Sequence, residues 1–391
     1  MDDRVGIWLC NVALGSLILG CSGSPSPAVQ SGGSGGMSVG GANNTNSTGG
    51  SPNNTAGGST SASSTSSTGG TWITTGGTSV SNTSSTGGAS TAGGGTSASS
   101  SLPEGNQGIA ARHPGDVGIA SDSNVIFADD FESYAKSADL NNRWDAVYQN
   151  QYANITTTAA NVYSGKQALE FTLPQQTAEL SDSTDKVISP ERDVLFLRYY
   201  SKFQPPYDVV GSSHNGSSIS AHYFINGQAT PGVPADGTNK FLANLEDWRG
   251  DATTASPGYL NVYAYHPEQR SQWGDHFFPN GDVMPNTSIK FDFGPNFVSR
   301  AQIIPDLDRW YCYEFMVQAN TPGQRDGRIA GWLDGKLVMD FMNLRLRDVA
   351  SLKIDRFGIS FHIGSNPNGE AKKWYDDVVA ASSYIGPMVA P

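Results

Sequence analysis

Short segments in which apolar and polar residues alternate dominate the chain from Val125 to its C-terminus. The run Leu260–Tyr265 places an aliphatic side chain at every second position, which is the period of a β-strand with one buried face. Gly, Pro and Asn separate such runs, and long helical spacing is hard to find. We predict strands at Val125–Phe127, Ala168–Thr172, Val194–Phe203, Leu260–Tyr265, Trp310–Gln318, Arg328–Leu333, Lys336–Phe341, Ile354–Ile363 and Trp374–Ala380. The pattern predicts an all-β sandwich or barrel, with a hairpin turn at Asp334-Gly335.

The alternation also indicates which side chains share a face. In Leu260–Tyr265 the aliphatic residues are expected to face the core, which leaves Tyr263 and Tyr265 on the opposite side. His362 falls on the open face of its own strand by the same reasoning. In Val194–Phe203 one face carries Phe196, Arg198, Tyr200 and Lys202. Open faces rich in Tyr, Arg, His and Asn differ from ordinary solvated surface, so we predict a polar binding cleft on a sheet.

The N-terminal part of the chain has a different composition. Residues 22–103 contain no charged residue and consist almost wholly of Gly, Ser, Thr, Asn and Ala. Such a segment has too little apolar surface to offset the entropy of ordering, so a disordered linker is predicted. No second linker interrupts the rest, so residues 104–391 are expected to form one domain.

An apolar run from Val5 to Gly20 precedes the linker and is too short to span a membrane. It ends in Ile18-Leu19-Gly20-Cys21, which resembles a bacterial lipobox. Residues 1–21 are therefore predicted to be a signal peptide, with Cys21 lipidated. This predicts an exported lipoprotein at the outer membrane or cell surface, or a secreted protein if the signal is an ordinary one.

Nearly all of the formal net charge of -12 belongs to the predicted domain, because the linker is uncharged. Nucleic acid is an improbable partner for such a domain, since binding it requires a basic surface. The glycines of the linker follow no strand and open no helix, so no phosphate-binding loop and no organic cofactor are predicted. Cys312 is expected to be a small buried residue of a strand.

Four segments carry a resemblance to a known family: Val125–Glu132, Trp310–Val317, Asp326–Val338 and Trp374–Ala380. They resemble concanavalin A-like jelly-roll domains, in particular the polysaccharide lyase-like group of alginate, glucuronan and heparin lyases. The resemblance covers roughly residues 125–387. It implies two packed antiparallel sheets and a glycan bound on the concave sheet.

The sequence departs from the jelly-roll retaining glucanases, because the signature Glu-x-Asp-x-x-Glu is absent. Glu246-Asp247 is the nearest acidic pair. A retaining hydrolase needs two carboxylates about 5 Å apart, so elimination is favoured over hydrolysis.

Cleavage of a uronate by elimination needs a base for the C5 proton, an acid for the leaving oxygen and a group that neutralises the carboxylate. We assign the base to His214 or His222, the acid to Tyr265, and the neutralising group to Arg198 or Asn244. Aromatic rings stack on sugars, and polar groups bind their hydroxyls. Substrate contacts are therefore predicted from Tyr200, Lys202, Tyr263, His266, Trp332 and His362. Each of these residues also has an ordinary structural explanation, as a loop histidine, a sheet-face residue or an ion-pair partner.

The first and last predicted strands are rich in carboxylates, among them Asp130, Glu132 and Asp377. The terminal strands pair in jelly-roll domains, and gathered carboxylates suit a structural Ca²⁺ ion. The alternative is a solvated acidic edge that discourages aggregation.

The preferred function is an exported polysaccharide lyase. Two alternatives remain. One is a non-catalytic carbohydrate-binding or adhesion lipoprotein that uses Tyr263, Tyr265 and Trp332. The other is a glycoside hydrolase whose acids the sequence does not identify, with Glu246 and Glu314 as candidates.

Overall fold

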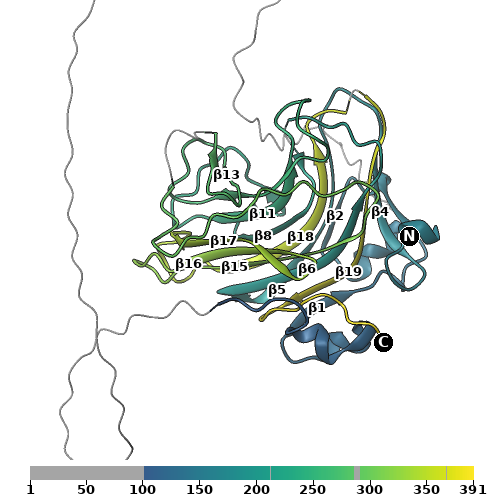
Figure 1. Ribbon diagram of the computed structural model, residues 1–391, viewed down its shortest axis with the longest axis horizontal. Coiled ribbons are helices and arrows are strands. Elements are labelled where there is room, and N and C mark those ends of the chain that lie inside the picture. The colour runs from purple at the N-terminus through teal and green to yellow at the C-terminus, as the bar shows by residue number, and fades with distance from the viewer. Residues whose placement is uncertain (1–100, 212, 286–290, 367) are drawn as a thin grey trace, which may run out of the picture. The chain divides into compact units, whose positions relative to one another are not determined.

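The computed structural model describes residues 101–211, 213–285, 291–366 and 368–391. The predicted signal peptide, Cys21 and most of the predicted linker lie outside the described residues. The described part folds into two large antiparallel sheets that form a sandwich (Figure 1). The prediction of an all-β jelly-roll sandwich is therefore confirmed.

Sheet 1 has the strand order β17-β16-β15-β6-β19-β4-β3, and β1 pairs with β19. Its strands are β1 (Val125–Asp129), β3 (Ala153–Thr156), β4 (Ala168–Leu173), β6 (Val194–Phe203), β15 (Tyr311–Gln318), β16 (Gly327–Leu333), β17 (Lys336–Leu344) and β19 (Ala371–Ala381). The first and the last strand of the domain thus lie side by side.

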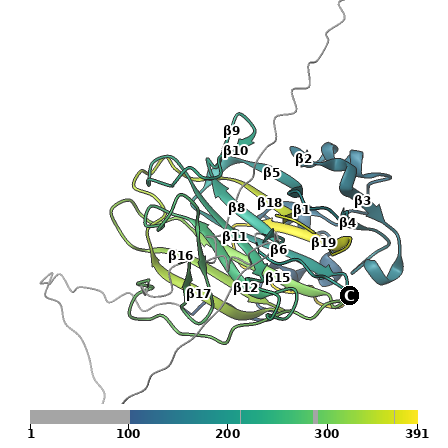
Figure 2. The ribbon, with the colours of Figure 1, turned by 90° about the horizontal axis from the view of Figure 1, so that it is seen from above.

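Sheet 2 has the order β14-β13-β12-β11-β8-β18-β5-β2, and β7 pairs with β18. Its strands are β2 (Ala146–Tyr148), β5 (Leu180–Arg192), β7 (Ser213–His214), β8 (Ser217–Ala221), β11 (Phe241–Trp248), β12 (Tyr259–Tyr265), β13 (Asp275–Phe277), β14 (Val283–Met284) and β18 (Ile354–Ile363). A separate hairpin pairs β9 (Phe224–Ile225) with β10 (Gln228–Ala229), and Figure 2 shows it projecting from the sandwich.

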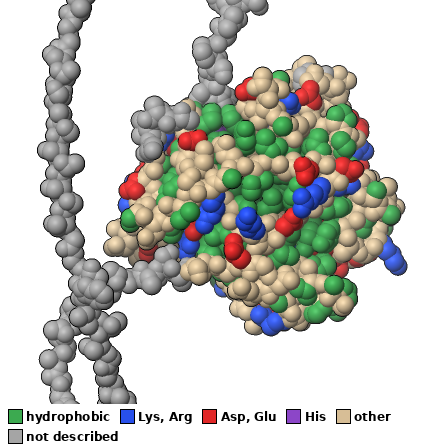
Figure 3. Space-filling model, viewed as in Figure 1, with side chains coloured by type: hydrophobic (Ala, Val, Ile, Leu, Met, Phe, Trp, Pro, Cys, Tyr) green, Lys and Arg blue, Asp and Glu red, His purple; other side chains and the backbone are tan. Residues whose placement is uncertain are grey.

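The helices are short 3₁₀ turns: η1 (Ile109–Arg112), η2 (Pro114–Asp116), η3 (Ile119–Ser121), η4 (Ser137–Asn142), η5 (Asn150–Tyr152) and η6 (Ala159–Asn161). Within the described ranges, no helix has the length and apolar character needed to cross a membrane. On the face shown in Figure 3, charged side chains of both signs are interspersed.

The core lies between the sheets and follows the predicted alternation. Leu260, Val262 and Ala264 belong to the core cluster, and the tyrosines between them point to the other side of sheet 2. The predicted hairpin is present, because β16 and β17 are joined at Asp334 and Gly335, which both have positive φ.

The outer face of sheet 1 is covered by the chain's own terminal segments (Figure 1). Backbone N–H groups of Ile109 and Ala110 donate to Tyr384 and Ile385 carbonyls. The indole N–H of Trp332 donates to the carbonyl of Pro103 over 2.9 Å. Residues 101–124 are therefore an integral part of this sheet's packing, and they leave sheet 2 as the sheet with an open polar face.

Candidate functional site

A row of polar and aromatic residues crosses the face of sheet 2 that points away from the core. The row follows the strand register through Asp185, Gly358, Ser218, Asn244, Tyr263 and His276. Directly paired residues share a face, and neighbouring strands lie about 4.8 Å apart. The same strands bury Ile219, Ala243 and Ile359 on the opposite face. Sheet 2 therefore presents an apolar face to the core and a polar face to a cleft.

The cleft above this row has a cavity volume of about 90 Å³. Its lining is Tyr148, Ser181, Ser183, Asp185, His214, Ser218, Tyr223, Phe224, Ala229, Leu242, Asn244, Ser360 and His362. The β9–β10 hairpin reaches across it, since the Tyr148 hydroxyl donates to the carbonyl of Gly227 over 2.7 Å. The predicted residues His214, Asn244 and His362 thus line one cleft, although they come from three different strands.

His214 and Glu246 form the central ion pair of the cleft. The His214 Nδ1 atom lies 2.6 Å from Glu246 Oε2, and the Glu246 side chain is fully buried. Burial raises the pKa of Glu246, while the charge of His214 lowers it. The His214 ring lies 4.8 Å from the Tyr263 ring and 5.2 Å from that of His362. A buried carboxylate at this position orients the imidazole and stabilises its protonated form, which is what a general base requires.

Two further histidines on this face are neutral. Burial, together with the nearby charge of His214, holds the pKa of His362 well below its usual value. The same causes lower the pKa of His276 to about 3. His276 lies 3.0 Å from the side-chain oxygen of Asn261. A neutral imidazole such as His362 can donate a hydrogen bond to developing negative charge without giving up its proton.

Asn244 lies in the middle of the polar row and lines the cleft. Its Oδ1 atom is buried and has no hydrogen-bond partner among the described residues. Its side chain also lowers the pKa of Glu246 by hydrogen bonding. The amide therefore connects the ion pair with the open cleft.

Tyr263 and Tyr265 share this face but lie beneath its surface. The Tyr263 hydroxyl accepts the N–H of Gly274 over 2.9 Å, and the Tyr265 hydroxyl accepts that of Gly232 over 3.1 Å. Tyr265 is fully buried and does not line the cleft. The prediction that Tyr265 supplies the acid is therefore not supported by its position. Tyr148 and Tyr223 are the tyrosines that do line it, and the sequence assigned a site role to neither of them.

Four predicted site residues lie in sheet 1, and their predicted roles are wrong. Arg198 is fully buried, forms an ion pair with Asp116 and donates to the carbonyl of Asp377. Lys202 donates to Asp308 Oδ1 over 2.9 Å. The other two residues also contact parts of the protein itself: the Tyr200 ring stacks on Tyr163, and the indole N–H of Trp332 donates to the Pro103 carbonyl. These residues face away from sheet 2, so none of them contacts a chain bound in its cleft.

His222 and His266 also lie outside the cleft, which corrects their predicted roles. His222 follows β8, is half-exposed and pairs with Glu191 at 3.0 Å. His266 is buried beside Asp275, at 3.2 Å, and its ring packs against Phe277.

The two acids named for the hydrolase alternative belong to different sheets. Glu314 in β15 accepts the N–H groups of Ile385 and Gly386 over 2.7 and 2.8 Å. Glu246 lies in β11 of sheet 2. The two carboxylates therefore cannot act on one bond.

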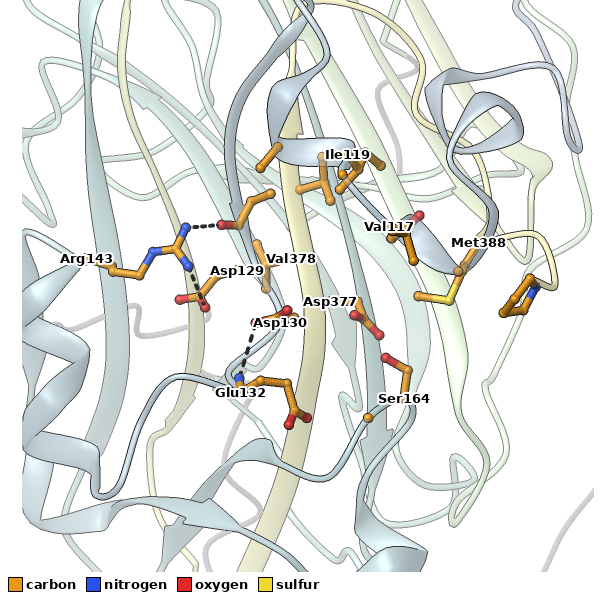
Figure 4. Close-up of a pocket in the computed structure, with 18 residues that line it drawn as sticks. Val117, Ile119, Asp129, Asp130, Glu132, Arg143, Ser164, Asp377, Val378 and Met388 are labelled. Carbon is orange, nitrogen blue, oxygen red and sulfur yellow. Dashed lines mark hydrogen bonds and ion pairs between the residues drawn. The ribbon is translucent and has the colours of Figure 1, made fainter.

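The three predicted calcium ligands line a second cavity of about 560 Å³ beside the β1–β19 pair (Figure 4). Glu132 Oε1 already accepts two backbone N–H groups, and Asp130 accepts the N–H of Glu132. Burial raises the pKa of Asp377 to about 6, and its Oδ2 atom has no hydrogen-bond partner within the described ranges. No group of three or more His, Cys, Asp or Glu side chains in those ranges is placed to hold a metal ion. A calcium ion at this position stays a prediction.

The fold and this cleft define the class of the protein: an all-β jelly-roll sandwich with a buried His–Glu pair in a polar cleft on one sheet. No protein-family model matches the chain, and no curated protein sequence matches it.

Similar solved structures include three polysaccharide lyases. Alginate lyase Aly36B is 18% identical, with a TM-score of 0.48, over 67% of this chain and 98% of that one. A marine PL-14 alginate lyase from Aplysia kurodai is 13% identical, with a TM-score of 0.46, over 66% and 100% of the two chains. The endo-β-1,4-glucuronan lyase from the fungus Trichoderma reesei is 17% identical, with a TM-score of 0.39, over 66% and 96%.

Proposed function

We propose that this chain is an exported protein that cleaves a uronate-containing polysaccharide by β-elimination in the cleft of sheet 2. The observation that carries the proposal is the short contact between His214 and the buried Glu246 in a cleft that also holds Asn244 and the neutral His362. This set supplies a base with an orienting carboxylate and two groups able to hydrogen-bond a substrate carboxylate.

The reaction requires one proton to leave the substrate and one to enter it. His214 takes the proton from C5, and the electron pair of the broken C–H bond forms the C4–C5 double bond as the C4–O bond breaks. The leaving oxygen takes a proton from the hydroxyl of Tyr148, a half-buried tyrosine that lines the cleft. Asn244 and His362 hydrogen-bond the uronate carboxylate and stabilise the charge that develops on it.

The test is a screen of the purified protein against uronate polysaccharides, alginate and glucuronan among them. Elimination produces an unsaturated uronate, which absorbs in the ultraviolet, whereas hydrolysis produces only reducing ends. We expect His214→Ala to abolish the rise in absorbance and His222→Ala, outside the cleft, to leave it unchanged. Full activity of His214→Ala would contradict the assignment of the base, and a flat trace on every polysaccharide would contradict elimination.

The carbohydrate-binding alternative relied on an aromatic platform of Tyr263, Tyr265 and Trp332. All three rings are buried, and Trp332 lies in the other sheet. They therefore do not form the exposed platform that this alternative requires. Binding of a polysaccharide in an affinity gel, without cleavage, would restore this alternative.

Export by a lipid anchor forms part of the same proposal and rests on the lipobox-like sequence before Cys21. Labelled fatty acid should be incorporated by the full-length chain expressed in a Gram-negative host and not by its Cys21→Ala variant. Equal incorporation by both would refute lipidation at this residue.

A further inference from the structure

One lysine side chain lies between the two sheets. Lys373 in β19 is 1% exposed, and its ammonium group lies 3.8 Å from the ring centre of Phe203 and 5.3 Å from that of Tyr375. Its neighbour Lys372 points to the other face and pairs with Glu170 at 3.1 Å. Lysine is almost never fully buried unless it is paired, so the position of Lys373 calls for a reason beyond packing.

The ammonium group contacts the loop that carries the proposed base. Lys373 Nζ donates to the backbone carbonyl of Asn215, the residue that directly follows His214. The hydroxyl of Tyr375 donates to the same carbonyl over 3.1 Å. Two side chains of β19 thus hold the backbone beside His214 from underneath.

Asn215 in turn connects this loop to the strand that carries Glu246. Its side-chain amide donates to the carbonyl of Asp247 over 2.9 Å, and its side-chain oxygen accepts the N–H of Asp247 over 2.9 Å. Asp247 directly follows Glu246 in β11. A set of hydrogen bonds therefore runs from Lys373 to Asn215 and Asp247, the residues that directly follow His214 and Glu246 in the sequence.

Several titratable groups surround Lys373. Burial lowers the pKa of Lys373 to about 7, while the nearby carboxylates Asp247 and Glu246 act in the opposite direction. In return, the charge of Lys373 lowers the pKa of both carboxyl groups. The phenols beside its ammonium group, Tyr313 and Tyr375, have pKa values raised by burial and stay neutral. Asp182 on β5 has a raised pKa as well. Lys373 is thus the basic group of this buried set.

We propose that Lys373 is a positioning residue for the cleft, which acts from between the sheets by fixing the backbone beside His214 and by placing positive charge beneath Glu246. The role as a catalytic aid rests on the proposed function. The structural and electrostatic coupling to His214 does not depend on it.

The test replaces the charge by an apolar side chain of similar length. Removal of a positive charge increases the proton affinity of nearby groups, so Lys373→Met should raise the apparent pKa of the coupled His214–Glu246 pair by about one unit. The measurement is the NMR titration of the His214 ring in the whole folded protein, without substrate. Lys372→Met, one residue away and on the opposite face, should leave the titration unchanged.

Removing one member of a buried charged cluster destabilises the fold, so the titration is made on variants whose urea unfolding remains cooperative. Lys373→Gln, which keeps a polar group, provides a second variant with the same expected shift. An unchanged His214 titration in the variants that fold would overturn the proposal. If the wild-type protein eliminates no uronate, the proposed function fails, whereas the titration still tests the role of Lys373. If it does, the pKa on the acid limb of kcat/KM should shift with the titration.

Discussion

A buried carboxyl group in sheet 2 permits a quantitative prediction about stability. Asp182 in β5 is fully buried, and neither oxygen of its carboxyl group has a hydrogen-bond partner in the described part of the chain. Burial raises its pKa from the usual 3.8 to about 9. The folded protein therefore keeps a proton on Asp182 at neutral pH, and the unfolded chain releases it.

The magnitude follows from the linkage between proton binding and folding. A group whose pKa is raised on folding contributes stability that is full below its unfolded pKa and is lost as the pH rises toward its folded pKa. From pH 4 to pH 7 the loss extends over about three pH units at about 1.4 kcal/mol each, or about 4 kcal/mol. Asn has the same shape and no proton to lose, so Asp182→Asn should escape this loss.

The assay is urea unfolding of the wild-type protein and Asp182→Asn at pH 4 and pH 7. We expect similar stability of the two at pH 4 and a free energy of unfolding about 4 kcal/mol higher for the variant at pH 7. Asp306→Asn serves as the control, because the side chain of Asp306 is 74% exposed. If the difference between wild type and Asp182→Asn is the same at both pH values, the burial argument is refuted.

Three further predictions concern the cleft and the acidic cavity. Glu246→Gln should lower kcat of the proposed elimination by roughly 10²-fold or more, because the orienting charge beside His214 is lost. An unchanged kcat in steady-state kinetics would mean that Glu246 has only a structural role. In Gly358→Ala the new Cβ atom would lie 2.0 Å from Asp185 Oδ1. We therefore expect the free energy of unfolding in urea to fall by about 1–3 kcal/mol. An unchanged free energy of unfolding would contradict this close contact. If the acidic cavity binds Ca²⁺, a chelator should lower Tm and added Ca²⁺ should restore it, whereas a constant Tm would exclude structural calcium there.

The strands that alternation predicted are those with a consistent apolar face. β6 and β18 have the bounds that were predicted, Val194–Phe203 and Ile354–Ile363. β5 was not predicted because its core-facing positions include the polar Asp182 and Thr184, so apolar and polar residues hardly alternate in its sequence. β11 was not predicted either, because Leu242 lies among polar residues on its cleft face and the alternation of apolar and polar positions is therefore unclear. A strand with polar groups on its core side cannot be recognised from hydrophobicity alone.

The same limit explains the errors in the predicted site. Alternation correctly placed Arg198, Tyr200 and Lys202 on one face of β6, but that face belongs to sheet 1. The segment that covers it includes Asp116, which lies 82 residues away from Arg198 in the sequence. Period and composition indicate which residues share a face. They do not indicate which distant segment will cover that face.

The two polar faces of the sandwich differ in how their buried groups are satisfied. On sheet 1 the terminal segments supply contacts to the buried groups, since Asp116 pairs with Arg198 and backbone N–H groups of the C-terminal segment bind Glu314, although Arg198 Nε and Asp377 Oδ2 have no hydrogen-bond partner in the described ranges. On sheet 2 the side-chain oxygen of Asn244 and both ring nitrogens of His362 lack hydrogen-bond partners in the ranges that the structure describes. Buried polar groups without partners are costly, and a bound ligand is one means of satisfying them. A sugar chain in the cleft would supply hydroxyl and carboxylate groups to these atoms. Unsatisfied groups occur on both sheets, but Asn244 and His362 line the cleft that also holds His214, so a ligand bound there would satisfy atoms to which the described part of the chain makes no hydrogen bond.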